Sequence, residues 1–124
     1  MEISEREVRG VTILDLRGRF ILESGVEVFN QRMNELRHRG CRRILLNFDE
    51  VTYLDSAGVG AIAWKYVTAR KRNSDVKVLN LRPKSHTVLN TTKLLTVLES
   101  FDSEDAAVNS FVDTDDDETN PLFT

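Results

Sequence analysis

The sequence has few of the residues that build cross-linked or metal-centred proteins: one cysteine, Cys41, and two histidines, His38 and His86. A lone cysteine excludes an intrachain disulfide and a cysteine-rich metal site. The two histidines are far apart and have no partners at metal-ligand spacing, so we expect no structural zinc. We accordingly expect neither a metal nor a cofactor.

Long hydrophobic runs are also missing. No stretch approaches the roughly 20 apolar residues that span a bilayer, and the chain opens on the charged sequence MEISERE. We therefore expect a cytoplasmic protein that does not associate with membranes. With 124 residues, 40% of them hydrophobic and 30% charged, the composition predicts one globular domain. We assign that domain to residues 1–112 and predict a disordered acidic tail at residues 113–124.

The net charge of −3 conceals an uneven distribution of charge. Basic residues crowd the middle of the chain: Arg37, Arg39, Arg42, Arg43, Lys65, Arg70, Lys71, Arg72, Arg82 and Lys84. They fall on predicted helix ends and exposed helix faces, and the isoelectric point of about 5.4 is low for a protein that binds polyanions. We interpret them as a solvated surface and expect no direct nucleic-acid partner.

The spacing of apolar residues predicts that strands and helices alternate after an opening hairpin. Alternation on both sides of Gly10 indicates two strands joined by a tight turn, with pairing that ends at Gly18. The expected strands cover residues 3–8, 11–16, 44–48, 51–54 after a polar bend at 49–50, 76–81 and 96–101, and the expected helices begin at residue 23 or 24, after residue 56, after Pro83 and at Ser103 as a cap. The order β-β-α-β-α-β-α-β-α predicts an α/β fold with a mixed, mostly parallel sheet.

The most informative segment is VTYLDSAGVG, residues 51–60, which places Ser56 where a buried strand ends and a helix begins. A hydroxyl there lies at the positive end of a helix dipole and suits a nucleophile, a helix cap or a phosphate acceptor. A hydrolase elbow needs glycine two residues before its serine, and Leu54 occupies that position. The histidines also fit no triad order. We therefore predict no catalytic residue and no enzymatic activity.

The residues around Ser56 allow several interpretations. Either Asp55 or Ser56 is a natural helix cap. The sequence GVGAIA, residues 58–63, matches the G-x-G-x-x-[GA] pattern of dinucleotide sites, so a nucleotide-binding domain is one alternative. We prefer the interpretation that Gly58 and Gly60 let the helix start pack closely on the sheet or on a partner.

Helical spacing aligns Ser56, Gly60 and Trp64 along one edge of the expected helix. This row lies off the apolar stripe that we expect at residues 59, 62, 63, 66 and 67. Small residues that lead to the single tryptophan suit a partner surface. The alternative is that Trp64 folds over the core.

The segments ILLNF, residues 44–48, and VTYLDSAGVG, residues 51–60, resemble the signature of STAS domains, specifically of bacterial anti-sigma-factor antagonists. The resemblance covers about residues 1–112 and includes the opening hairpin, Gly18 and TTKLL at 91–95. It implies a D-S-x-G serine, here Ser56, that is phosphorylated by a partner which is both an anti-sigma factor and a serine kinase. Asp55 and Gly58 would shape the loop that presents this serine.

The sequence differs from the family pattern in three places. Ala57 replaces a second hydroxyl that many relatives carry, RFIL at residues 19–22 replaces an acidic segment, and the acidic tail is additional. The resemblance implies that the unphosphorylated protein binds the kinase and frees a sigma factor, that phosphorylation releases it, and that a PP2C-type phosphatase restores it. The expected contact residues are Asp55, Ser56, Ala57, Gly58, Gly60 and Trp64. A further alternative is a STAS-type scaffold or sensor subunit of a signalling or transport complex, in which Ser56 is only a cap.

Overall fold

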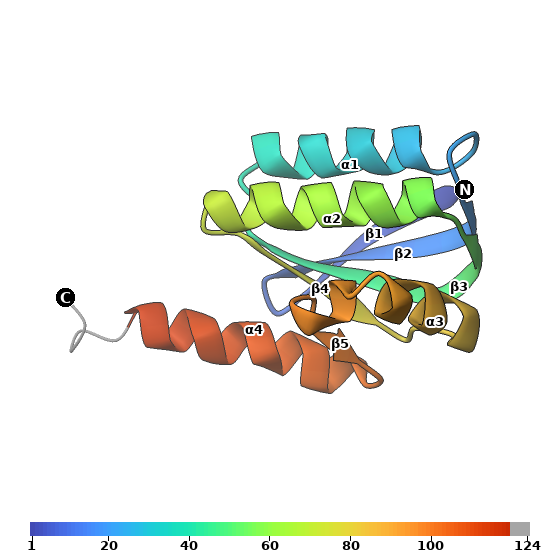
Figure 1. Cartoon of the computed structure of the whole chain (residues 1–124). Helices are drawn as coiled ribbons and strands as arrows, with labels where there is room; N and C mark the ends of the chain where they lie inside the picture. Colours follow the sequence, from blue (N-terminus) through green and yellow to red (C-terminus); the bar gives the residue numbers. More distant parts are fainter. Residues whose placement is uncertain (120–124) are drawn as a thin grey trace.

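The chain begins with the predicted hairpin (Figure 1), in which β1 (Glu2–Val8) pairs antiparallel with β2 (Val11–Phe20). The structure is a computed structural model that describes residues 1–119, with side chains as far as Phe111. The hairpin turn consists of Arg9 and Gly10, which have φ angles of 48° and 82°. Two successive positive φ angles give the turn a twist that matches the twist of the paired strands.

Three more strands extend the sheet in sequence order: β3 (Arg43–Leu54), β4 (Asp75–Leu79) and β5 (Ser100–Phe101). The order across the sheet is β1-β2-β3-β4-β5, and every pair after the first is parallel. The centre of β3 is apolar and buried because helices cover both faces of the sheet at this point. The predicted fold class, a mixed and mostly parallel α/β sheet, is therefore confirmed.

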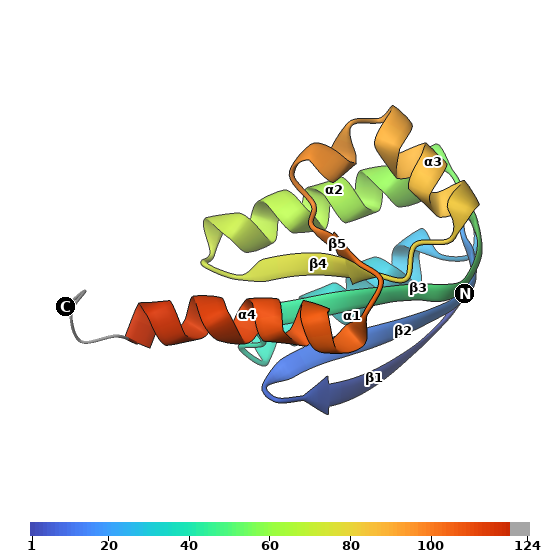
Figure 2. The ribbon, with the colours of Figure 1, turned by 90° about the horizontal axis from the view of Figure 1, so that it is seen from below.

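The helices cover the two faces unequally (Figures 1 and 2). One face carries α1 (Val26–His38), α2 (Ser56–Lys71) and α3 (Pro83–Thr91), followed by the short 3-10 helix η1 (Leu94–Thr96), and α4 (Glu104–Thr119) crosses the other face. The larger core lies under α1 and α2, where the Phe20 ring contacts Phe29 and Phe48 at centroid distances of 4.9 and 6.4 Å. The smaller core lies under α4 and consists of Val11, Ile13, Leu45, Leu79, Ala107, Val108 and Phe111.

The central strands are longer than predicted. β3 continues through Asp49 and Glu50, so the predicted bend there is wrong. Both side chains are exposed, and a strand can carry polar residues where its face is open to solvent. β2 likewise continues past Gly18, which pairs with Val51 at an irregularity in the register. The pairing between the two hairpin strands ends at Gly18 as predicted, since the last pair is Glu2 with Arg17, but the predicted end of the second strand at residue 16 is wrong.

Other boundaries also differ from prediction, including the end of β4 at Leu79 instead of residue 81. Only Ser100 and Phe101 pair with β4, because residues 94–96 form η1 instead of the start of a strand. The first helix begins after Gly25 rather than at residue 23 or 24. The Ser24 hydroxyl donates to the Arg19 carbonyl at 3.0 Å and so closes the preceding loop instead of capping the helix.

The last helix, α4, begins as predicted behind a capping serine, since the Ser103 hydroxyl accepts from the Ala106 amide at 3.3 Å. The helix continues through the acidic residues to Thr119, and residues 120–124 lie outside the described part of the chain. The disorder that we predict for residues 113–124 stays a prediction.

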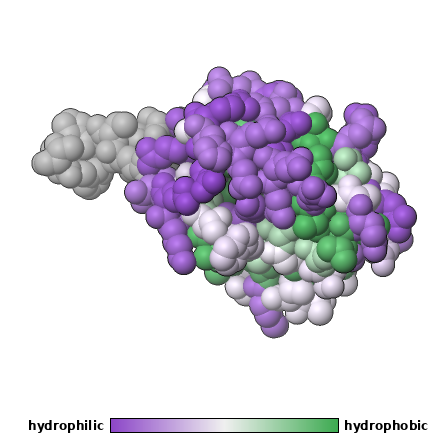
Figure 3. Space-filling view, turned by 90° about the horizontal axis from the view of Figure 1, so that it is seen from above, coloured by the Kyte–Doolittle hydropathy of each residue, from purple (hydrophilic) through white to green (hydrophobic). Residues whose placement is uncertain are grey.

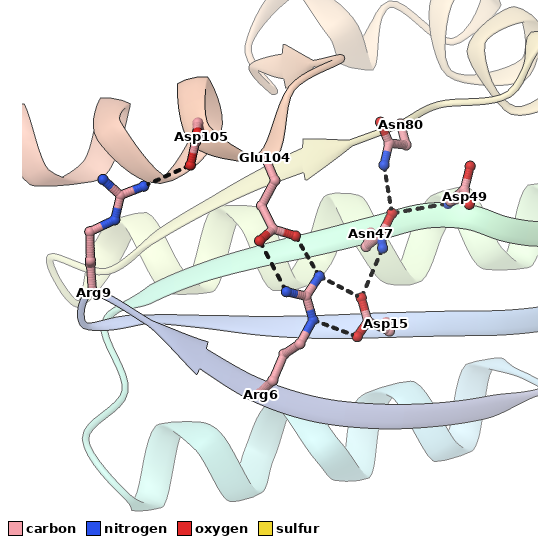
Figure 4. Close-up of polar contacts among 8 residues, drawn as sticks. All are labelled: Arg6, Arg9, Asp15, Asn47, Asp49, Asn80, Glu104 and Asp105. Atoms are coloured by element: carbon pink, nitrogen blue, oxygen red, sulfur yellow. Dashed lines mark hydrogen bonds and ion pairs between the residues drawn. The ribbon is translucent and has the colours of Figure 1, made fainter.

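Arg6 ties the start of α4 to the sheet (Figure 4). Its guanidinium donates to Asp15 Oδ2 at 2.8 Å and to Glu104 Oε1 at 2.6 Å, and Asn47 Nδ2 donates to Asp15 Oδ1 at 2.8 Å. Burial raises the pKa of Asp15, but the hydrogen bonds from Arg6 and Asn47 outweigh burial and leave this pKa below its ordinary value. The hydrogen bond from Arg6 likewise lowers the pKa of Glu104.

We expect Arg6→Met to lower the free energy of unfolding at neutral pH by about 1 kcal/mol. The effect is modest because the Arg6 side chain is 39% exposed and its ion pairs are screened by solvent. The folded pKa values of both carboxylates are lowered, so this stabilisation is complete above their ordinary pKa of about 4 and is lost as the pH falls through the folded values. Urea unfolding measured from neutral pH down to about pH 2 should depend less on pH in the variant.

Arg17→Met is the matched control for Arg6, because its pairs with Glu50 and Glu2 are more exposed than those of Arg6. We expect it to change stability less at every pH. If Arg6→Met unfolds like the unmodified protein across the whole range, Arg6 does not stabilise the docking of α4.

Candidate functional site

The junction between β3 and α2 is held by Asp55. Its Oδ1 accepts from the Gly58 amide at 2.9 Å, which makes Asp55 the N-cap of α2. Its Oδ2 accepts from the Leu22 amide at 3.2 Å, and its own amide donates to the Phe20 carbonyl at 3.3 Å. One carboxylate therefore fixes both the start of α2 and the loop that follows β2.

Ser56 is the first residue of α2, and it is exposed. Its hydroxyl forms no hydrogen bond with any residue in the described part of the chain. Because Asp55 is the cap, the alternative in which Ser56 serves as the cap is wrong. The amides of the first helical turn have no intrahelical acceptor, so the hydroxyl lies where negative charge is favoured.

The two glycines of the motif have different environments. A Cβ atom on Gly58 would lie 2.5 Å from the Phe20 carbonyl oxygen and 2.8 Å from Leu54 Cδ1. A Cβ atom on Gly60 would meet no atom within 4 Å. The preferred interpretation of close packing on the sheet thus holds for Gly58, whereas Gly60 is open to solvent. The Gly58 amide is already bound by Asp55, whereas a dinucleotide site uses free amides.

Ser56, Gly60 and Trp64 lie along one exposed edge of α2. Trp64 is 64% exposed and does not fold over the core. The buried face of the helix is formed by Gly58, Val59, Ala61 and Ile62, and Ala57 is half-buried. Val67 is 44% exposed, so its predicted place on the apolar stripe is wrong. In Figure 3, pale and green atoms gather over the side of the molecule where α2 lies, and purple atoms over the side of α1.

Sequence reasoning missed two residues beside this turn, Leu22 and Tyr53, which are 62% and 52% exposed. Leu22 follows β2 and reaches the turn through its amide bond to Asp55. Tyr53 stands opposite Arg19 in the β2–β3 register, and the guanidinium lies 5.9 Å from the ring centroid. An apolar residue at a strand end gives no sign of exposure in the sequence, so no local signal identifies either residue.

Within residues 1–119, no group of three or more histidine, cysteine, aspartate or glutamate residues could hold a metal ion. No helix in the same part of the chain is long and apolar enough to cross a membrane.

The sheet, the three helices on one face and the exposed serine at the start of α2 define a class of small α/β domain organised around a displayed turn. The chain belongs to the STAS domain family, whose model matches residues 2–107.

One relative, the anti-sigma F factor antagonist of Paenibacillus polymyxa, is 25% identical over 104 residues, which cover 84% of this chain and 89% of the relative. Among solved structures, an anti-sigma factor antagonist from Mycobacterium paratuberculosis has a TM-score of 0.79 at 16% identity, covering 88% of this chain and 92% of that one. The anti-sigma factor antagonist SpoIIAA in its unphosphorylated form has a TM-score of 0.75 at 19% identity, covering 89% and 96%. These structural likenesses concern the fold.

Proposed function

We propose that this protein is a cytoplasmic, non-enzymatic anti-sigma-factor antagonist that is controlled by phosphorylation of Ser56. In the unphosphorylated state it binds a serine-kinase anti-sigma factor and frees a sigma factor. Phosphorylation releases the antagonist from the kinase, and a PP2C-type phosphatase restores it. The observation that carries the proposal is the exposed hydroxyl of Ser56 at the start of α2. Asp55 caps the helix, so this hydroxyl is not needed as the cap. The relative from Paenibacillus polymyxa supports it by its name.

The position of Ser56 explains how a phosphate could change binding without changing the fold. A phosphoserine carries about −1.5 to −2 charges at neutral pH. Within the free domain, the helix dipole and the amides of the first turn of α2 favour that charge. In a protein interface the same group loses its hydration and lies beside the Asp55 carboxylate. Phosphorylation therefore lowers the affinity for the partner and leaves the domain folded.

The surface around Ser56 has the composition of an interface. Exposed Leu22, Tyr53 and Trp64 supply apolar and aromatic groups of the kind that dominate binding energy. A cavity of about 390 Å³ lies beside the turn and is lined by Tyr53, Leu54, Pro83, Lys84, Thr87 and Val88. We propose that the kinase contacts Ser56, Gly60 and Trp64 along α2 and inserts an apolar side chain into this cavity.

We expect the serine kinases encoded near the gene, with ATP, to place a single phosphate on Ser56. Mass spectrometry of the digested protein measures the position. Ser56→Ala should remove the label, because Ala57 leaves no second hydroxyl in the turn. Thr52→Ala is the matched control, since Thr52 is an exposed hydroxyl on the same segment and its loss should leave labelling unchanged. Failure of every such kinase to label Ser56 would contradict the switch.

A further inference from the structure

A cavity of about 550 Å³ opens between the C-terminal halves of α1 and α2, at the opposite end of α2 from Ser56. Met33 and Ile44, both buried, form part of its apolar lining together with Ala69. Trp64 also lines it. This volume lies within the range of small-molecule sites, which are mostly apolar with a few polar groups that orient the ligand.

The polar groups of this cavity are strongly biased in charge. In the described part of the chain, its lining includes the four cations Arg37, Arg42, Lys65 and Arg72 and no aspartate or glutamate. Two of these cations donate hydrogen bonds to neutral oxygens. Lys65 Nζ donates to Asn34 Oδ1 at 2.9 Å, and Arg42 Nη2 donates to the Asn73 carbonyl at 3.1 Å. Elsewhere on the protein Arg6, Arg9, Arg17, Arg32, Arg39 and Arg70 each pair with a carboxylate. Among the described residues, the four cavity cations have no such pair.

Favourable interaction with helix dipoles explains the positions of only some of these four cations. Arg37 and Arg72 lie at the C-terminal ends of α1 and α2, where positive charge is favoured. Lys65 lies in the middle of α2, where the helix dipole does not stabilise a positive charge. Burial and the nearby charge of Arg37 lower the pKa of Lys65. A negatively charged group in the cavity would relieve this repulsion.

We propose that this cavity binds a small organic anion with an apolar body, of the alkyl carboxylate or alkyl phosphate class. The charged head lies among Arg37, Lys65 and Arg72, and the apolar body lies over Met33 and Ile44. This site is separate from the Ser56 turn and shares Trp64 with the proposed kinase contact, but the inference does not depend on the proposed antagonist function.

Trp64 makes the proposal directly testable because it lines the cavity and is the only tryptophan in the chain. We would titrate the full chain with octanoate and octyl phosphate and, at the same chain length, with octylammonium and octanol. Both anions are expected to change the Trp64 fluorescence saturably in the millimolar range, and the cation and the alcohol are not. Saturation by only one anion would support the site and identify its preferred headgroup.

Lys65→Met and Arg72→Met should each weaken binding of the saturating anion about tenfold, since each removes one charged contact and keeps most of the side-chain stem. Lys71→Met is the matched control, because Lys71 is an exposed neighbour on α2 that does not line the cavity. Circular dichroism checks that the variants are folded. The proposal is overturned if octylammonium or octanol saturates as the anions do, if neither anion saturates, or if both cavity variants bind the saturating anion as the unmodified protein does.

Discussion

Ser56→Asp is expected to weaken binding to the kinase partner by at least about 100-fold. The aspartate places a negative charge at the centre of the proposed interface, beside Asp55, where its desolvation costs several kcal/mol and each 1.4 kcal/mol corresponds to about a factor of ten. The thermal midpoint should remain nearly unchanged, because a negative charge at the first residue of α2 is favoured by the helix dipole. Isothermal titration calorimetry with the purified kinase measures the first effect, and thermal unfolding measures the second.

Two controls separate the effect of charge at this position from other causes. Ser56→Ala removes the hydroxyl without adding charge and should bind the kinase about as tightly as the unmodified protein. Asn109→Asp adds the same charge on α4, on the opposite face of the sheet, and can keep the hydrogen bond that Asn109 Oδ1 accepts from Arg9. It should also leave binding unchanged. Retention of kinase binding by Ser56→Asp, or a large fall in its thermal midpoint, would contradict the proposed switch.

Gly58→Ala is expected to lower the free energy of unfolding by about 1–3 kcal/mol. The new methyl group would lie 2.5 Å from the Phe20 carbonyl oxygen, so either α2 or β2 must move. The obstructing atom belongs to the backbone, which cannot rotate away as a flexible side chain can. Because the same movement displaces Asp55 and Ser56, kinase binding should weaken along with stability. Urea unfolding measures the change in stability.

Gly60→Ala is the control for Gly58→Ala, since both substitutions add one methyl group to the same helix. A Cβ atom on Gly60 meets nothing within 4 Å, and alanine is favoured over glycine in a helix. We expect Gly60→Ala to raise the free energy of unfolding by up to about 1 kcal/mol. Equal effects of the two substitutions would show that helix propensity, rather than close packing against Phe20, decides the role of Gly58.

Much of the fold follows from local patterns. Gly10 between two alternating runs predicted the hairpin, and the change from strand to helix spacing after residue 54 predicted the start of α2. The errors occur where pairing with a distant strand outweighs local preference. Asp49 and Glu50 look like a bend, yet β2 continues beside them and keeps β3 extended. Residues 96–99 look like a strand, but η1 takes up the first of them and pairing begins only at Ser100.

At the candidate site, too, local patterns in the sequence predicted some features and contacts between distant residues decided others. The motif identified Ser56 and Gly58, and helical spacing identified Trp64. Neither showed which residue caps α2 or whether Trp64 is buried. The residue that caps α2 is Asp55, and its second carboxylate oxygen accepts a hydrogen bond from the amide of Leu22, 33 residues earlier in the chain. No spacing rule connects residues so far apart in the sequence, and Leu22 was missed for this reason.

The sequence by itself determined the order of strands and helices, the class of sheet and the place of Ser56 at a strand-to-helix junction, because these depend on the spacing of apolar and small residues along neighbouring positions. Only the tertiary structure decided that Asp55 is the cap, that Gly58 touches the Phe20 carbonyl, that Trp64 faces solvent and that four cations converge between α1 and α2. The physical reason is that burial and charge pairing depend on segments that meet only after the chain has folded.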